Sequence, residues 1–404
     1  MIIHQPEIIQ KSGQVYLSAR IETSRPISNF PKNLWYSFPE NYISFLDERA
    51  DGFAASLLLI AMLFQEDLEV RGEISPKLTA GMAAFQTVYS SWFPQHFKQI
   101  AIKCAHQTSP VFKPKRKFAM TFSGGLDSFY TLRKNLSPHQ PDPARQLSAA
   151  IFVHGFDLRL DDEANRDLTL RQFSAMFSRL GMELYTCSTN IYQFSEFRIG
   201  WPLAHTAPLA GAALIFAPLF KSTYIPTADE YLGQRLNGKP PKTDKLLSTE
   251  STTTISHGHD SNRREKLAAI MHWPEAQNHL RVCVDKKRIR GVQNCSRCDK
   301  CLTLMTDLEL SGMLPEFNTF HGTLSLSKFI FWGLTKPIYY PNQKALRKKA
   351  LLAGRKAILY KLRLLLALGW IRKLVVSRLH ALLPGWLEYR LKRTLYKPEF
   401  DPRP

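Results

Sequence analysis

The chain has 404 residues, of which 44% are hydrophobic and 22% are charged, and its formal net charge is +20 at pH 7. This composition is ordinary for a globular protein and leaves room for two domains and an appendage. The first residues lack the basic start and apolar run of a signal peptide, and the apolar runs at 53–64 and 202–220 are too short or too interrupted to span a bilayer. We therefore expect a soluble, cytoplasmic protein.

Residues 1–112 are predicted to form a small N-terminal α+β domain. The apolar pattern predicts strands at 14–22, 68–70 and 97–104, a helix at 50–64 and a second helix that opens at Ser75. Ser75 is expected to cap that helix, because a proline follows it at the first helical position. We find no chemical motif in this part of the sequence.

Residues 113–317 alternate between short apolar strands and helices, which is typical of an α/β fold with a doubly wound parallel sheet. The predicted strands are 118–122, 149–154, 183–187 and 222–226, and the predicted helices are 127–134, 161–180, 203–216 and 261–271. Residues 229–262 break the alternation and are rich in Gly, Pro, Ser, Thr and His. Such a long segment is predicted to be a substrate loop or to be disordered.

The first strand of this region runs into the segment Ser123-Gly124-Gly125-Leu126-Asp127-Ser128. Two glycines allow a tight turn that directs successive N–H groups toward one point, and the helix that follows adds its partial positive charge. The hydroxyl groups of Ser123 and Ser128 add donors, so the loop suits pyrophosphate. It is not a Walker loop, because no Lys-Ser or Lys-Thr pair follows the glycines. Asp127 is predicted to hold Mg²⁺.

This string resembles the signature of the PP-loop ATP pyrophosphatase superfamily, and the resemblance covers about residues 117–310. It implies a fold like that of the adenine nucleotide alpha hydrolases and cleavage of ATP to AMP and pyrophosphate through an adenylated intermediate. The residues 123–128 are then the ATP-binding segment, with Ser123 and Asp127 as its catalytic residues. His154 ends the second strand, where it either caps the strand or lies near the adenine or ribose.

Four of the six cysteines lie between residues 283 and 301. Two consecutive x₂ spacings place Cys295, Cys298 and Cys301 on one knuckle, and Cys283 arrives from upstream. Four thiolates complete the tetrahedral shell of a structural Zn²⁺, with an iron–sulfur cluster as the rival. Basic residues from Arg281 to Lys300 could offset the negative charge of such a site.

A knuckle of this kind after a PP-loop domain is similar to that of the 7-cyano-7-deazaguanine synthases, PP-loop enzymes of queuosine biosynthesis. The chain departs from that family in having Ser296 where Gly is usual, an additional N-terminal domain and a basic C-terminal extension. The resemblance therefore implies a divergent relative.

Several polar residues are candidates for contact with a substrate. Most of them follow predicted strands or lie in the 229–262 segment, where a doubly wound sheet binds its ligand. They are His205, Asp229, Glu230, His257, His259, Asp260 and Arg263. For the two histidines of the loop we favour a contact with substrate or phosphate over a metal.

Residues 318–404 are predicted to form a basic helical extension. Residues 343–404 alone carry a net charge of +13, about two thirds of the excess of the whole chain. Apolar and basic residues alternate in them, which suits an anionic membrane surface, a partner protein or, less well, a nucleic acid. A helical cap with solvated charges is the alternative.

Together these patterns predict an ATP-dependent ligase-like enzyme that uses ATP and Mg²⁺ and contains Zn²⁺. It would adenylate a carboxylate or amide oxygen of a small-molecule substrate for attack by ammonia or another nitrogen nucleophile. A tRNA-modifying PP-loop enzyme and a non-catalytic ATP-binding partner protein are the alternatives.

Overall fold

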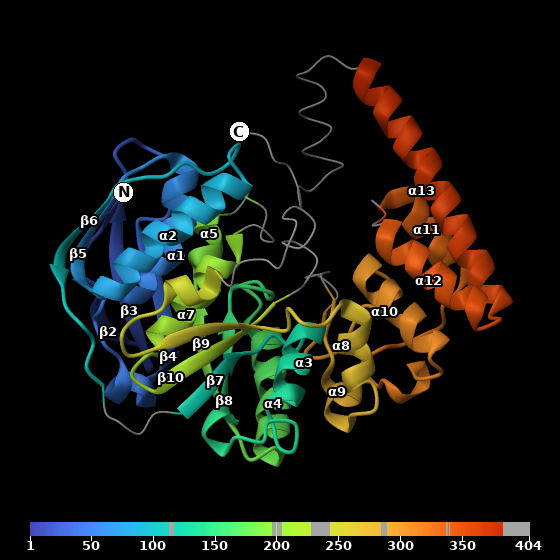
Figure 1. Cartoon of the computed structure of the whole chain (residues 1–404), viewed down its shortest axis with the longest axis horizontal. Coiled ribbons are helices and arrows are strands. Elements are labelled where there is room, and N and C mark those ends of the chain that lie inside the picture. The colour runs from blue at the N-terminus through green and yellow to red at the C-terminus, as the bar shows by residue number, and fades with distance from the viewer. Residues whose placement is uncertain are drawn as a thin grey trace.

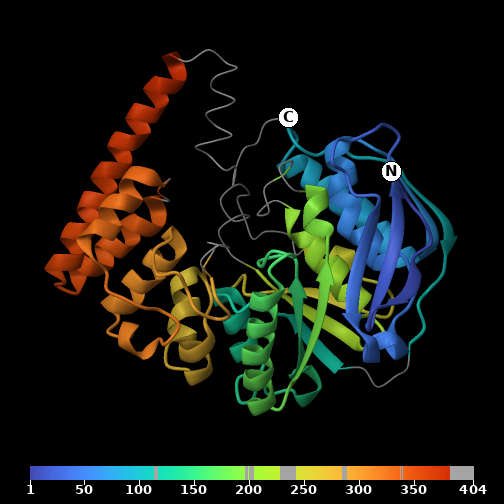
Figure 2. The same ribbon diagram turned by 180° about the vertical axis from the view of Figure 1, so that it is seen from behind.

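The computed structural model describes residues 1–112, 117–195, 199, 204–227, 243–283, 289–336, 338 and 340–382. Within these ranges the chain is a mixed α/β structure, with a large, mostly parallel sheet at one end and a group of helices at the other (Figures 1 and 2). No helix of the described part is long and apolar enough to cross a membrane.

Eleven strands form the sheet, in the order β11-β10-β7-β8-β9-β4-β3-β1-β5-β6, and β2 pairs with β3. They are β1 (Ile2–Ile3), β2 (Glu7–Lys11), β3 (Gln14–Glu22), β4 (Asn33–Pro39), β5 (Leu68–Ile74), β6 (Ile102–Gln107), β7 (Lys117–Thr121), β8 (Leu147–His154), β9 (Glu183–Thr189), β10 (Phe220–Pro226) and β11 (Thr253–His257). The strands β7 to β11 are parallel to one another. Their carboxyl ends therefore meet at one edge of the sheet, which we call the carboxyl edge.

The N-terminal strands continue this sheet rather than forming one of their own. β4 pairs with β9 antiparallel, with Tyr36 opposite Thr189 and Ser37 opposite Ser188. One apolar core contains side chains from both sides of residue 112, including Phe53 of α1 and Phe216 after α7. The predicted boundary at residue 112 thus does not coincide with a break in the sheet or in the core.

Twelve α-helices are described, and the five whose bounds were predicted, α1, α3, α4, α7 and α8, begin and end within three residues of those bounds. They are α1 (Asp51–Phe64), α2 (Pro76–Trp92), α3 (Leu126–Lys134), α4 (Glu163–Arg179), α5 (Ile191–Ser195), α7 (Thr206–Ile215), α8 (Arg263–Ile270), α9 (Pro274–His279), α10 (Asp299–Leu310), α11 (Leu326–Thr335), α12 (Tyr340–Leu352) and α13 (Lys356–Leu382). The cap at Ser75 is confirmed, because its side chain accepts a hydrogen bond from the Leu78 amide.

Strand β11 was not predicted, and the prediction of a continuous loop over 229–262 is wrong for residues 253–257. The strand looked like a loop because its inward side chains are polar. Thr254 and Ser256 are buried, and they donate hydrogen bonds to the main chain and side chain of Asp244. A polar residue at a buried position of a strand gives no apolar alternation to detect.

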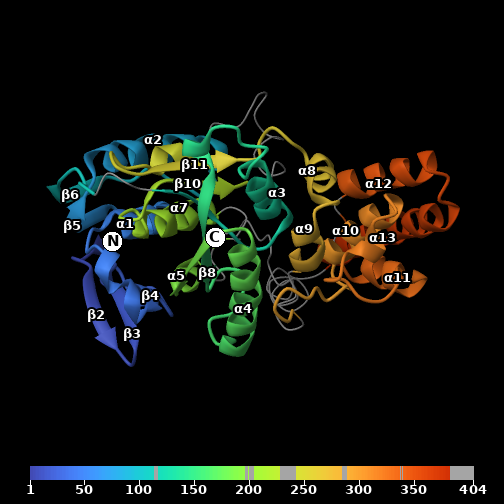
Figure 3. The ribbon, with the colours of Figure 1, turned by 90° about the horizontal axis from the view of Figure 1, so that it is seen from below.

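Helices α10 to α13 enclose a separate apolar core that contains Leu302, Phe329, Trp332, Leu362 and Leu365. Figure 3 shows α11, α12 and α13 at the end of the molecule opposite to the N-terminal strands. The basic extension is therefore a packed helical unit up to residue 382, as far as the structure describes it.

Candidate functional site

The loop between β7 and α3 turns tightly at the carboxyl edge. Gly124 has φ of +78°, and a Cβ atom added there would lie 2.5 Å from the Phe173 ring, so the turn requires glycine. Gly125 is the N-cap residue of α3, whose first N–H groups have no partner within the helix. The Ser128 Oγ accepts the Ser123 amide at 3.2 Å and lies 3.0 Å from the Ser123 Oγ. The two hydroxyl groups thus hold the turn in shape.

A buried lysine from α8 reaches Asp127 in the first turn of α3. The Lys266 Nζ lies 2.8 Å from the Asp127 Oδ1 and donates to the Thr227 carbonyl at 2.6 Å. Its side chain is 1% exposed, whereas that of Asp127 is 26% exposed. Asn262 and Glu265 form a capping box that fixes the start of α8 and thereby the position of Lys266 one turn later. The loop therefore has an ammonium group beside its carboxylate.

A buried arginine approaches the loop from the other side. The Arg281 guanidinium donates to the Ser123 carbonyl at 2.9 and 3.3 Å, and the Arg281 amide donates to the Gly124 carbonyl at 2.8 Å. Asp157 lies 3.6 Å from the guanidinium, while the buried Nη1 has no hydrogen-bond partner among the described residues. Burial lowers the pKa of Arg281, and Asp157 and Cys283 oppose that shift. A buried cation with an unused donor would be stabilised by an anion in the loop.

His154 lies at the carboxyl edge, as predicted, but its ring nitrogens contact the protein. Nδ1 is 3.2 Å from the Ser188 Oγ and Nε2 is 2.8 Å from the Arg159 carbonyl. Burial lowers the pKa of this 1% exposed histidine, so the ring is neutral at pH 7. Its role as a nucleotide ligand stays a prediction, and it would require the ring to give up one of these contacts.

His257, at the end of β11, contacts α3, the helix that follows the loop. Nδ1 is 3.1 Å from the Thr131 Oγ1 of α3, and Nε2 is 3.0 Å from the Asn135 Nδ2. Because Asn135 can only donate through that nitrogen, Nε2 accepts and carries no proton. Burial lowers the pKa of His257 to about 4. As placed, the ring anchors α3, and its contact with a substrate or phosphate stays a prediction.

The other predicted substrate residues are spread over several elements. His205 precedes α7 and His259 follows β11, and both are half-buried; Asp260 is exposed and accepts a 3.5 Å hydrogen bond from Tyr130. Asp229 and Glu230 lie outside the described residues. None of these roles is settled by the geometry, so each of them stays a prediction.

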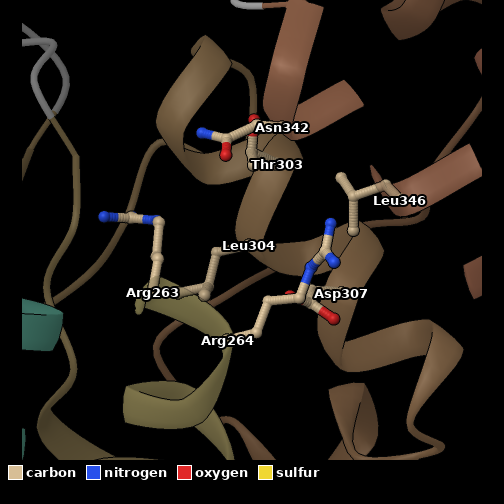
Figure 4. Close-up of a pocket in the computed structure, with 7 residues that line it drawn as sticks. All are labelled: Arg263, Arg264, Thr303, Leu304, Asp307, Asn342 and Leu346. Atoms are coloured by element: carbon tan, nitrogen blue, oxygen red, sulfur yellow. The ribbon is translucent and has the colours of Figure 1, made fainter. Parts of the chain in front are cut away.

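Arg263 lies at a hollow between three helices rather than beside the loop residues described above. The lining comes from the start of α8, from α10 and from α12: Arg263, Arg264, Thr303, Leu304, Asp307, Asn342 and Leu346. Figure 4 shows the Arg264 side chain directed toward Asp307 and the Arg263 side chain directed away from it. Asp307 is also ion-paired to Lys349 at 2.5 Å, which fastens α12 to α10.

The four clustered cysteines come together as predicted. The sulfur atoms of Cys283, Cys295, Cys298 and Cys301 all lie within 4.8 Å of one another, with Cys298 and Cys301 at 3.3 Å and Cys295 and Cys301 at 3.9 Å. Tetrahedral Zn–S bonds of about 2.3 Å require sulfur separations of about 3.8 Å. Hydrogen bonds from the other three thiols lower the pKa of Cys295 far below its usual value. The group is thus positioned to bind a metal ion.

Asn294 and Ser296 hold the two segments of this cluster together. The Asn294 Oδ1 accepts the amides of Val282 and Cys283 at 2.8 and 3.0 Å. Ser296, within the knuckle, has the left-handed conformation with φ of +53°. Its Oγ accepts the His321 amide at 2.9 Å, which offsets part of the cost of that conformation.

Comparison with protein-family models, with curated proteins and with solved structures finds no match to this chain. The functional argument therefore rests on the loop, on the cysteine cluster and on their surroundings.

The sequence did not identify Lys266 or Arg281 as residues of the loop. Lys266 lies 139 positions after Asp127, and Arg281 lies 158 positions after Ser123. Arg281 was expected to offset the charge of the cysteine cluster; it does interact electrostatically with Cys283, and its guanidinium also donates hydrogen bonds to the Ser123 carbonyl of the 123–128 loop. The only signal in the sequence was that Arg281 lies two residues before Cys283. A segment that carries a cysteine of the cluster is held in place by the cluster.

Proposed function

We propose that the protein binds ATP with its pyrophosphate end at the loop 123–128 and adenylates an oxygen of a small-molecule substrate. One observation carries the proposal: a Ser-Gly-Gly-x-Asp-Ser turn lies at the carboxyl edge of five parallel strands, between the buried cations Lys266 and Arg281. Helix N-terminus, hydroxyl groups and two cations together suit a group as highly charged as pyrophosphate.

In the proposed reaction, a carboxylate or amide oxygen of the substrate attacks the α-phosphorus of ATP. The bond between the α-phosphorus and the bridging oxygen breaks, and pyrophosphate leaves with the electron pair into the loop. A nitrogen nucleophile then attacks the adenylated carbon, which loses AMP and forms a carbon–nitrogen bond. The chain contributes by orienting the reactants and by stabilising the charge of the leaving group.

The four thiols fit the proposed Zn²⁺, and Mg²⁺ is proposed from the Asp127 carboxylate alone. Asp127 would hold Mg²⁺, which would neutralise charge on the phosphates, and in the described structure Lys266 supplies a positive charge at that carboxylate. Four thiols without an open position would hold Zn²⁺ in a structural role. We further propose that residues 113–317 form a doubly wound sheet of the PP-loop type, related to the 7-cyano-7-deazaguanine synthases.

The test has a binding arm and a turnover arm. Calorimetry with ATP and with inorganic pyrophosphate in the presence of Mg²⁺ measures binding, and pyrophosphate release with candidate carboxylates, deazaguanine carboxylates first, measures turnover. Ser123→Ala and Asp127→Asn should each reduce turnover by about 100-fold or more without unfolding the chain. Asp142→Asn, which makes the same change at an exposed helix cap, should leave both measurements unchanged.

Release of ADP and inorganic phosphate instead of AMP and pyrophosphate would contradict the proposed bond cleavage. Tight ATP binding with no turnover on any carboxylate would favour a nucleotide-sensing protein instead. The loop would have no part in the reaction if the Ser123→Ala and Asp127→Asn chains were as active as the wild type.

A further inference from the structure

Helix α13 packs one of its faces closely and leaves another exposed. Leu362 and Leu365 are buried in the core shared with α11 and α12. Gly333 and Gly369 let the chain segments approach, because a Cβ at Gly333 would lie 2.9 Å from the Leu368 Cβ and one at Gly369 would lie 2.1 Å from Ile338. Figures 1 and 3 show α13 at the outer end of the molecule, away from the sheet.

The outward face of α13 combines apolar and cationic side chains at spacings of three and four residues. Tyr360, Trp370, Ile371 and Val375 are between 48% and 61% exposed. Arg363 and Arg378 are exposed on the same face, because a helix turns about 100° per residue. We call these six residues the α13 stripe; it runs for about 27 Å along the helix.

The charge around the stripe is of one sign. Residues 318–382 contain thirteen Lys or Arg and no Asp or Glu. Two of these lysines are used internally: the Lys349 Nζ contacts Asp307, and the Lys361 Nζ donates to the Leu324 carbonyl at 2.6 Å. No carboxylate of this segment can therefore pair with Arg363 or Arg378.

The position of these arginines distinguishes between possible occupants. A helix that lies in a membrane surface keeps its cations on the polar face and buries an apolar face without them. In α13, Arg363 and Arg378 are in line with Trp370 and Ile371, so burial among acyl chains would bury both charges. A second copy of the chain would bring four stripe arginines together with no carboxylate from residues 318–382 to pair with them. Spacing of three and four residues is instead that of helices that pack side by side.

We propose that the α13 stripe binds an acidic amphipathic helix of a partner protein. The apolar side chains of that helix would cover Trp370, Ile371 and Val375, and its carboxylates would pair with Arg363 and Arg378. Pairing in a partly desolvated contact makes these ion pairs specific for the partner and for its register. This proposal is independent of the activity of the phosphate loop.

The test uses the full-length chain and a synthetic helical peptide as probe. The peptide has about four heptads, with Leu at the a and d positions and Glu at e and g, so that its own charges oppose self-association. We expect binding in the micromolar range and a shift of tryptophan emission that is lost in Trp370→Ala. Arg363→Glu should weaken binding at least about tenfold, equivalent to about 1.4 kcal/mol.

Lys348→Glu is the matched control, since it makes the same change of charge at an exposed position of α12 outside the stripe. It should alter the affinity by no more than about twofold. An equal loss in Arg363→Glu and Lys348→Glu would show a non-specific charge effect and overturn the proposal. It would also be overturned by the absence of peptide binding, by Trp370-dependent binding to phosphatidylglycerol vesicles, or by a dimer that Trp370→Ala dissociates.

Discussion

The 123–128 loop and the cysteine cluster are joined by Arg281, yet they assemble their side chains in different ways. The loop takes its turn and its hydroxyl groups from six consecutive residues, but its two cations come from α8 and from the segment before Cys283. The cluster takes all four thiols from 19 consecutive positions, and Asn294 within the same stretch supports them.

This difference indicates that the loop depends on the cysteine cluster more than the cluster depends on the loop. The segment that carries Arg281 is fixed at Cys283 two residues later, so metal binding should order the arginine and through it the main chain of Ser123 and Gly124. The loop side chains Ser123, Ser128 and Asp127 instead contact the loop itself and Lys266. A substitution at the cluster should therefore disturb the loop, whereas a substitution in the loop should leave the cluster intact.

The largest expected effect is that of Cys295→Ser. Loss of one thiolate should remove the bound zinc, about one ion per chain in the wild type, and lower the free energy of unfolding by more than about 5 kcal/mol. Elemental analysis and chemical denaturation measure the two effects. Cys104→Ser, outside the cluster, is the control. Iron in place of zinc, or an unchanged stability, would refute the assignment.

Arg281→Met tests the connection between the two sites. It removes the guanidinium that contacts Ser123, so affinity for pyrophosphate should fall about 100-fold, or about 2.7 kcal/mol. Zinc content should stay at the wild-type value, because the thiols are unchanged. Arg179→Met, which removes an exposed ion pair with Glu275, should affect neither measurement. Parallel loss of zinc and pyrophosphate binding would show that Arg281 only supports the fold.

The third prediction concerns pH and the anchoring of α3. Burial lowers the pKa of His257 to about 4, whereas an unfolded histidine titrates near 6.5. Between these values the unfolded chain binds the proton and the folded chain does not, so this contribution to stability is complete above pH 6.5 and is lost as pH falls toward 4. Between pH 8 and pH 5 the loss should be about 2 kcal/mol.

Chemical denaturation of the wild type and of His257→Gln over this range measures that contribution, with His106→Gln at an exposed position as control. The His257→Gln chain should show a smaller fall of stability on acidification. The same pH dependence in both chains would mean that His257 does not anchor α3 as a neutral ring.

The smallest expected effect is that of Lys266→Met. Removal of the ammonium beside Asp127 should lower the affinity for magnesium pyrophosphate about tenfold, or about 1.4 kcal/mol. Calorimetry at two Mg²⁺ concentrations separates this loss from a change in metal affinity. Lys245→Met, in the 3₁₀ turn before β11, is the control. Tighter pyrophosphate binding in Lys266→Met would show that the lysine competes with Mg²⁺ for Asp127.

Strong local patterns predicted most of the fold. The apolar strands of the α/β region, the cap at Ser75 and the helices α1, α3, α4 and α8 follow from residues near to one another in the sequence. β11 was missed because its buried residues Thr254 and Ser256 are polar and donate hydrogen bonds to Asp244, an arrangement that no local pattern reveals. The pairing of β4 with β9, which unites the N-terminal strands with the parallel ones, was also missed. Pairing between strands far apart in the sequence leaves no local pattern.

The sequence by itself determined the turn at Ser123-Gly124-Gly125 and the meeting of the four thiols, because each depends on backbone geometry over a few residues. Only the tertiary structure decided that Lys266 and Arg281 contact the loop and that His257 contacts α3. These contacts join residues more than 100 positions apart. These contacts form only when the strands and helices pack together, so local sequence patterns do not reveal them.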